Sequence, residues 1–172
     1  LLAREKKNTD PHIRLLHAAS HAQGAYTLLL LTPDGLSATI DPYGFRPLVM
    51  CRYKGGYLIA SEECAFRPFP EATDIHHLLR NRSWFWSTNG TMTEYLPTKQ
   101  PLEGRACSFE TLYFSAPESE LPLGISVQTY RKYLGQDLAQ KEKTILSPDL
   151  VTAVPDSSNE MARAYADELK VP

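Results

Sequence analysis

Apolar residues first recur at helical spacing near the start of the chain. Ile13, Leu16 and Ala19 lie three residues apart, and Leu15 widens the apolar stripe. Asp10 followed by Pro11 is typical of a helix start, because the carboxylate accepts amide N–H groups and proline has none to lose. We therefore predict a helix that begins after Asp10 and ends near Gly24.

From Ala25 the pattern becomes that of strands. The apolar run that ends at Thr32 is followed by the turn sequence Pro33-Asp34-Gly35, and Lys54-Gly55-Gly56 separates a second pair of runs. The four strands are predicted at residues 25–32, 36–41, 48–53 and 57–61. Short turns between consecutive strands indicate an antiparallel sheet. Residues 41–47, which join the two hairpins, predict a rigid corner in which Asp41 pairs with Arg46.

The middle of the chain is harder to interpret, because residues 67–104 have prolines and no sustained period. Residues 75–79 fit a short helix or a strand. The aromatic run at 84–86 predicts a cluster buried against the sheet. Asn81 and Asn89 begin glycosylation sequons, which we interpret as chance matches since no secretory signal is evident.

The last third predicts a strand at 108–114, a helix, a second strand and a second helix. Ser126 is placed to cap a helix that runs to about Glu142. Its apolar face is predicted from Val127, Tyr130, Leu134 and Leu138. Residues 150–154 are apolar and β-branched, as in a buried parallel sheet. The second helix is predicted at 159–169, with Met161, Tyr165 and Leu169 inward.

Composition excludes several functional classes. The sequence has 172 residues with 18 Lys and Arg against 20 Asp and Glu, so the formal net charge of −2 argues against nucleic acid or an anionic membrane as partner. The longest apolar run is too short to span a bilayer. The cysteines, Cys51, Cys64 and Cys107, do not form a disulfide framework, and we expect a reducing, cytoplasmic setting. The chain begins with Leu1 rather than Met, which suggests a piece of something longer.

Two local patterns suggest chemistry. Pro155-Asp156-Ser157-Ser158 lies between an apolar strand and a helix, where backbone N–H groups and hydroxyls suit a phosphate, although a serine there is more often a simple helix cap. His17 and His21 have the spacing of metal ligands, but no third ligand is evident, and hydrogen-bonded or solvated histidines are the simpler interpretation.

Three groups of motifs resemble one family. Gly24-Ala25-Tyr26, Asp41 to Leu48, and Tyr57 to Ala65 resemble the later part of the glutaminase domain of the amidophosphoribosyltransferases. Cys107 to Phe114, with the segments that follow it as far as Gly135, resembles the opening of their phosphoribosyltransferase domain. Val154 to Ser158 with Ala164-Tyr165-Ala166 is similar to its first strand, loop and helix. The order and spacing of these groups make the resemblance specific.

The resemblance implies an α+β / α/β protein in two parts. Residues 1–104 would be the C-terminal part of an N-terminal-nucleophile (Ntn) hydrolase αββα glutaminase domain. Residues 105–172 would begin a Rossmann-like type I phosphoribosyltransferase domain. The family makes 5-phosphoribosylamine from phosphoribosyl pyrophosphate and glutamine-derived ammonia, the first committed step of purine synthesis. Glutamine, phosphoribosyl pyrophosphate and regulatory purine nucleotides are the implied ligands, and a homo-oligomer is expected.

The resemblance also suggests site residues. Asp156, Ser157 and Ser158 match the pyrophosphate-side loop, Ser157 matches a position that helps to bind Mg²⁺, and Cys107 matches a ligand of the [4Fe–4S] cluster of some members. The chain has no N-terminal cysteine, no Asp-Asp pair and no Pro-Gly-Glu in residues 67–104. It is expected to lack both catalytic centres. The alternative is a non-catalytic relative that serves as an interaction or nucleotide-sensing module.

Overall fold

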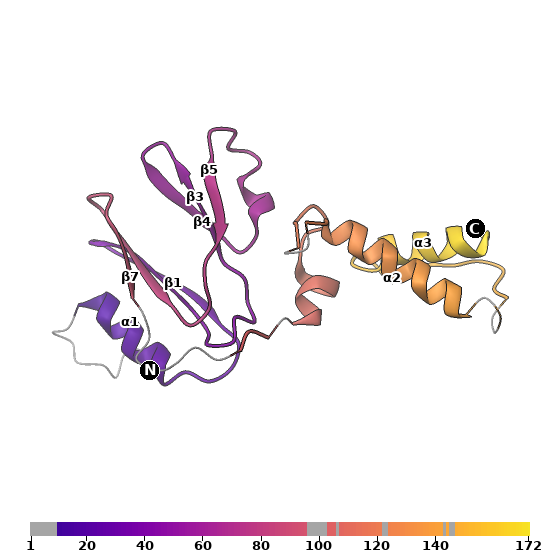
Figure 1. The fold of residues 1–172 in the computed structure, drawn as a ribbon, viewed down its shortest axis with the longest axis horizontal. Coiled ribbons are helices and arrows are strands. Elements are labelled where there is room, and N and C mark those ends of the chain that lie inside the picture. The colour runs from indigo at the N-terminus through magenta and orange to yellow at the C-terminus, as the bar shows by residue number, and fades with distance from the viewer. Residues whose placement is uncertain (1–9, 96–102, 106, 122–123, 143, 145–146) are drawn as a thin grey trace. The chain divides into compact units, whose positions relative to one another are not determined.

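The structure, a computed structural model, describes residues 10–95, 103–105, 107–121, 124–142, 144 and 147–172. The chain divides into two compact units, Leu1–Cys107 and Ser108–Pro172. Figure 1 shows the strands and the first helix in unit 1 and adjacent helices in unit 2.

Unit 1 contains two antiparallel sheets. Sheet A has the order β1 (Thr27–Thr32), β2 (Gly35–Ile40), β6 (Ser83–Ser87) and β7 (Met92–Tyr95). Sheet B has the order β4 (Gly56–Ala60), β3 (Val49–Tyr53) and β5 (Thr73–His77). Both predicted hairpins are confirmed, since Thr32 pairs with Gly35 and Tyr53 pairs with Gly56. Lys54 and Gly55 between the latter two have positive φ angles of 47° and 80°, which match the right-handed twist of a two-residue hairpin.

One apolar layer joins the inner faces of the two sheets. It consists of buried residues from β2, β6 and β3, together with Leu48, which immediately precedes β3. The other members are Ala38, Ile40, Met50, Trp84 and Trp86. Trp84 and Trp86 are buried as predicted, but the aromatic run at 84–86 is itself part of β6, an inner strand of sheet A. Residues 75–79, for which the sequence left helix or strand open, contribute to strand β5.

A short helical element also contacts each sheet. Helix α1 (Pro11–Ser20) contacts sheet A, and the 3₁₀-helix η2 (Glu63–Phe66) contacts sheet B. As predicted, the Asp10 carboxylate caps α1, accepting from the His12 amide at 2.7 Å. The helix ends at Ser20, before the predicted end at Gly24.

Unit 2 begins with a helical turn and not with the predicted strand at 108–114. Residues 108–109 are helical and continue into the π-helical turn η3 (Glu110–Phe114), which the Ser115 amide closes by donating to the Glu110 carbonyl at 2.7 Å. The Arg131 side chain is buried and donates to the carbonyl oxygens of Thr111 and Ser115. Arg131 thus satisfies the carbonyl groups that a strand would have offered to a neighbouring strand.

Helices α2 (Val127–Glu142) and α3 (Asn159–Leu169) pack against each other and confirm the two predicted helices. The predicted face of α2 was right at Val127 but wrong further along the helix, because the other buried residues are Arg131, Gly135 and Ala139. Leu138 is 49% exposed. Gly135 explains the rotation, since a Cβ there would lie 2.2 Å from the Met161 carbonyl oxygen of α3, so the absent side chain lets the helices meet.

Residues 150–154 form no strand, so this prediction was also wrong. Leu150 is 62% and Val154 80% exposed, and the Val151 amide donates to the Pro172 carbonyl at 2.8 Å. A strand requires a neighbouring strand, and no strand lies beside it in the described part of unit 2. None of the helices in the described ranges has the length and hydropathy needed to cross a membrane.

Candidate functional site

The loop 155–158 connects the extended segment to α3. Asp156 is exposed, and Ser157 and Ser158 are half-buried. The Asn159 amide donates to the Asp156 carbonyl at 3.2 Å, and the Ala162 amide donates to the Ser158 carbonyl at 2.8 Å. The backbone itself therefore folds the loop onto the start of the helix, and the three residues predicted as a phosphate site lie together there.

The two serines of this loop differ in their contacts. The Ser158 hydroxyl donates to the Val154 carbonyl and makes no cap on the helix. The Ser157 hydroxyl makes no hydrogen bond within the part of the chain that the structure describes. Ser158 thus shapes the loop, whereas the Ser157 hydroxyl takes no part in it within the described residues.

The packing of α2 against α3 sets the charge around this helix start. Glu160 lies in the first turn of α3, and its Oε2 is 3.6 Å from the Nζ of Lys132 on α2. At the other end of the pair, the Tyr165 hydroxyl donates to Glu142 Oε2 at 2.8 Å, and this hydrogen bond raises the pKa of Tyr165. Lys132 offsets the charge of Glu160, which would otherwise repel an anion at the helix start.

The cysteines do not assemble a cluster site in the described residues. Cys51 is fully buried in β3, and burial raises the pKa of its thiol, so it is a poor thiolate ligand. Cys64 lies in η2, and Cys107 is half-buried immediately before the helical turn of unit 2. No group of three or more His, Cys, Asp or Glu side chains in the described ranges is placed to hold a metal ion.

His21 forms a hydrogen bond with the helix backbone, and the rings of His17 and His21 contact each other. The His21 Nδ1 lies 2.9 Å from the His17 carbonyl oxygen, and the two rings are 4.9 Å apart. A ring nitrogen that bonds to a carbonyl carries its proton there, so His21 is hydrogen-bonded through Nδ1, and no third ligand joins the pair within the described residues. The contacts favour the simpler interpretation of hydrogen-bonded helix histidines.

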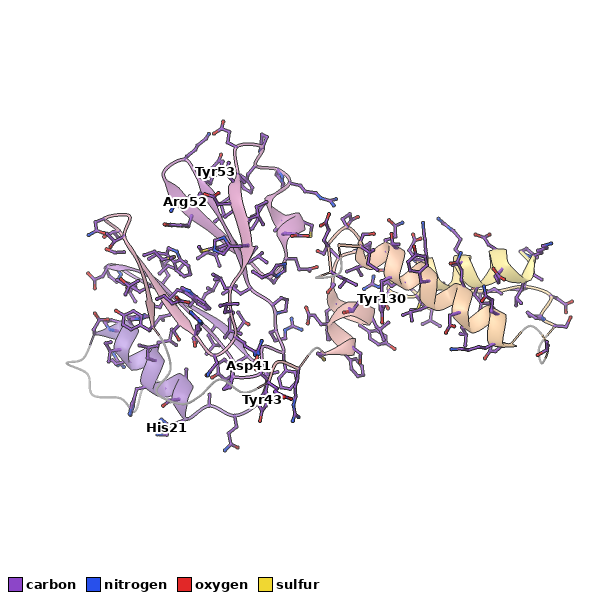
Figure 2. The ribbon with its side chains drawn as sticks, viewed as in Figure 1. His21, Asp41, Tyr43, Arg52, Tyr53 and Tyr130 are labelled. Atoms are coloured by element: carbon purple, nitrogen blue, oxygen red, sulfur yellow. The ribbon has the colours of Figure 1, made fainter. Side chains whose placement is uncertain are left out.

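Residues 41–47, here called the Asp41 corner, are organised by one buried carboxylate (Figure 2). Asp41 accepts from the amides of Tyr43 and Gly44 at 2.9 Å and from that of Phe45 at 3.0 Å. The sequence had suggested Arg46 as the partner of Asp41, and it missed these amides. The signal was present, since aspartate before a Pro-x-Gly turn commonly accepts amide groups from the residues that follow it.

Comparison with known proteins extends over both units. No family model matches the chain. It is 38% identical to amidophosphoribosyltransferase 1 of Arabidopsis thaliana over 161 residues, covering 93% of this chain and 27% of the relative. It is 33% identical to the Bacillus subtilis amidophosphoribosyltransferase over 159 residues, which is 92% of this chain and 32% of that protein. The chain is homologous to part of the amidophosphoribosyltransferases.

The solved structures agree with this relationship. The B. subtilis glutamine phosphoribosylpyrophosphate amidotransferase, complexed with ADP and GMP, superimposes with a TM-score of 0.79 at 32% identity, over all of this chain and 36% of that one. A second structure, described as the allosteric regulatory enzyme of purine biosynthesis, gives 0.78. The resemblance seen in the motifs is confirmed, and the fold is the mixed α and β arrangement of the corresponding part of the amidophosphoribosyltransferases.

Proposed function

We propose that the complete protein is an amidophosphoribosyltransferase. One observation carries the proposal: a single continuous match runs through both units, covering 93% of the chain at 38% identity. A match confined to unit 1 would suit any glutamine amidotransferase, whereas unit 2 adds the phosphoribosyl half. The chain spans only 27% to 39% of the length of its curated relatives, so the activity belongs to the proposal for the whole protein.

The proposed reaction has two steps. Glutamine is hydrolysed to glutamate and ammonia by an N-terminal cysteine nucleophile. Ammonia then attacks C1 of phosphoribosyl pyrophosphate, so that the C1–N bond forms, the C1–O bond to pyrophosphate breaks, and ammonia loses a proton. On this proposal, residues 1–104 belong to an Ntn-type αββα glutaminase domain and residues 105–172 open a Rossmann-like phosphoribosyltransferase domain.

The loop 155–158 is the proposed binding site in unit 2. Its donors suit a diphosphate, because amide groups and the Ser157 hydroxyl lie at the start of an 11-residue helix. The same hydroxyl and the exposed Asp156 carboxylate are the oxygen ligands that Mg²⁺ prefers. Bound Mg²⁺ would neutralise the charge of the pyrophosphate leaving group. Asp156 and Ser157 would orient the diphosphate, while Ser158 holds the loop to Val154.

A [4Fe–4S] cluster needs four cysteine thiolates. The chain has three cysteines, and Cys51 is buried, so the cysteines of this chain do not by themselves fit a cluster. Cys107 is proposed as at most one ligand. We also propose purine nucleotides as regulators, and the B. subtilis structure, which is complexed with ADP and GMP, supports this. The proposal further includes a homo-oligomer and a cytoplasmic setting, although the plant relatives are named as chloroplastic.

The alternative of a non-catalytic interaction or nucleotide-sensing module is not favoured, since the curated relatives in bacteria, archaea and plants are named as enzymes. The deciding experiment measures pyrophosphate released from phosphoribosyl pyrophosphate by the purified complete protein. We expect release with glutamine or with an ammonium salt, and with glutamine one glutamate for each pyrophosphate. Absence of release with either nitrogen source would reject the enzyme proposal.

A further inference from the structure

Asp41 makes hydrogen bonds to segments outside the Asp41 corner as well as within it. In addition to the amides of the corner itself, the Asp41 carboxylate accepts from the Tyr26 amide at 3.4 Å, and Asp41 donates its backbone N–H to the Tyr26 carbonyl at 2.9 Å. Its carbonyl accepts from the amides of Gly44 at 3.1 Å and Asn81 at 3.2 Å. Its side chain is fully buried. One residue therefore fixes β1, the corner and the start of β6 relative to one another.

Residues 103–105, which lie shortly before unit 2 in the sequence, contact this corner. The Arg105 amide donates to the Tyr43 carbonyl at 3.0 Å, and the Arg105 guanidinium carbon lies 4.9 Å from the centre of the Tyr43 ring. Both contacts converge on the residue whose own amide is held by Asp41. Figure 2 shows Asp41 and Tyr43 next to each other in unit 1.

Arg80 makes a second connection between the same two segments. A Cβ at Gly44 would lie 2.8 Å from the Arg80 Cβ, and a Cβ at Gly104 would lie 2.8 Å from Arg80 Nη1. Arg80 is therefore packed between two glycines, one in the corner and one beside Arg105. Gly44 also has a backbone φ angle of 71°, which residues other than glycine rarely adopt.

We infer that the Asp41 corner anchors residues 103–105, so that the chain leaves unit 1 for unit 2 from a fixed point. This inference rests on the proposed function for its consequence. If unit 1 belongs to the half that releases ammonia and unit 2 to the half that uses it, the anchored residues belong to the segment that joins the two halves. Tyr43 and Arg105 are then positioning residues for nitrogen transfer, and neither touches a substrate in this role.

The test uses the complete protein and two readouts, the first of which is cleavage after Glu103 by a glutamyl endopeptidase under native conditions. We expect Arg105→Ala and Tyr43→Leu to be cleaved about two- to fivefold faster than the wild type, because each loses the contact between cation and ring. Tyr43→Phe keeps the ring and should be cleaved at the wild-type rate. Lys54→Ala is the matched control, since it removes an exposed cation 5.1 Å from the Tyr53 ring in sheet B.

The second readout is pyrophosphate release with glutamine divided by release with ammonium. The ratio should fall in Arg105→Ala and Tyr43→Leu and stay unchanged in Tyr43→Phe and Lys54→Ala. Wild-type cleavage rates in the first two variants would overturn the anchor, and faster cleavage with an unchanged ratio would overturn its role in transfer. If the wild type releases no pyrophosphate at all, the proposed function fails, and the cleavage rates alone decide the anchor.

Discussion

At the residue scale, the two neighbouring serines of the loop 155–158 allow function and stability to be separated. Ser157→Ala removes a hydroxyl with no hydrogen bond to the described residues, so it should leave the unfolding free energy nearly unchanged. In the complete protein it should weaken the use of phosphoribosyl pyrophosphate and raise the Mg²⁺ requirement. Ser158→Ala removes the bond to Val154 and should cost about 1 kcal/mol. Steady-state kinetics and denaturant unfolding measure these effects, and unchanged kinetics in Ser157→Ala would refute the binding role.

His12 is the residue from which we expect a pH effect on stability. His12 is 2% exposed, its Nδ1 lies 2.9 Å from the Ser37 hydroxyl, and its Nε2 is buried without a hydrogen-bond partner among the described residues. Desolvation by burial lowers the pKa of His12 from its ordinary value of 6.5, while the charge of Asp10 opposes the shift. The unfolded chain therefore binds the proton more readily than the folded one does. The stabilisation is complete above pH 6.5 and is lost as the pH falls from 6.5 towards the lower folded pKa.

The measurement is the unfolding free energy of His12→Gln between pH 7 and 5. We expect a shallower decline than in the wild type, because glutamine keeps a hydrogen-bonding group near Ser37 but does not titrate. His21→Gln, which changes an exposed histidine of the same region, should keep the wild-type slope. Equal slopes in the wild type and His12→Gln would contradict this prediction.

At the element scale, the contact between α2 and α3 depends on the missing side chain of Gly135. In an exposed helix, alanine would be favoured over glycine by about 1 kcal/mol. Here a Cβ would lie 2.2 Å from the Met161 carbonyl oxygen, which is backbone and moves only with its helix. We expect Gly135→Ala to destabilise the pair by about 1–3 kcal/mol. Thermal unfolding followed by circular dichroism measures the change, with exposed Gln136→Ala as the control, and a stabilised Gly135→Ala would show that the contact is not tight.

At the scale of the whole molecule, the exposed apolar residues govern association. Leu28, Leu29 and Leu31 on the edge strand β1 are 41%, 50% and 79% exposed. An edge strand with apolar side chains and available backbone groups pairs readily with other chains. We expect the 172-residue chain on its own to self-associate at micromolar concentrations, and Leu31→Lys to reduce this with an unchanged far-ultraviolet spectrum. Sedimentation velocity tests the prediction, which fails if the unchanged chain is monomeric or if Leu31→Lys associates equally.

The sequence alone determined those features that depend on neighbours a few residues away. Both hairpins follow from their turn residues, which admit the required backbone angles, and α1 begins where an aspartate precedes a proline. The limits of α2 and α3 follow in the same way from local patterns. The similarity to the amidophosphoribosyltransferases could also be predicted from the sequence, because it rests on the order of short motifs. The position of a loop at Asp156–Ser158 before a helix could be predicted as well.

Only the tertiary structure decided the features that depend on distant partners. Residues 108–114 are helical because Arg131, far along the chain, binds carbonyl groups of that turn, and residues 150–154 are no strand because a strand needs a neighbour. The buried face of α2 is set by the close approach of Met161 to Gly135. The contact between Arg105 and Tyr43 joins two segments that are separated in the sequence by strands β3 to β7. Turn and cap preferences act within a few residues, whereas burial and hydrogen bonding between elements depend on which segments the completed fold brings together.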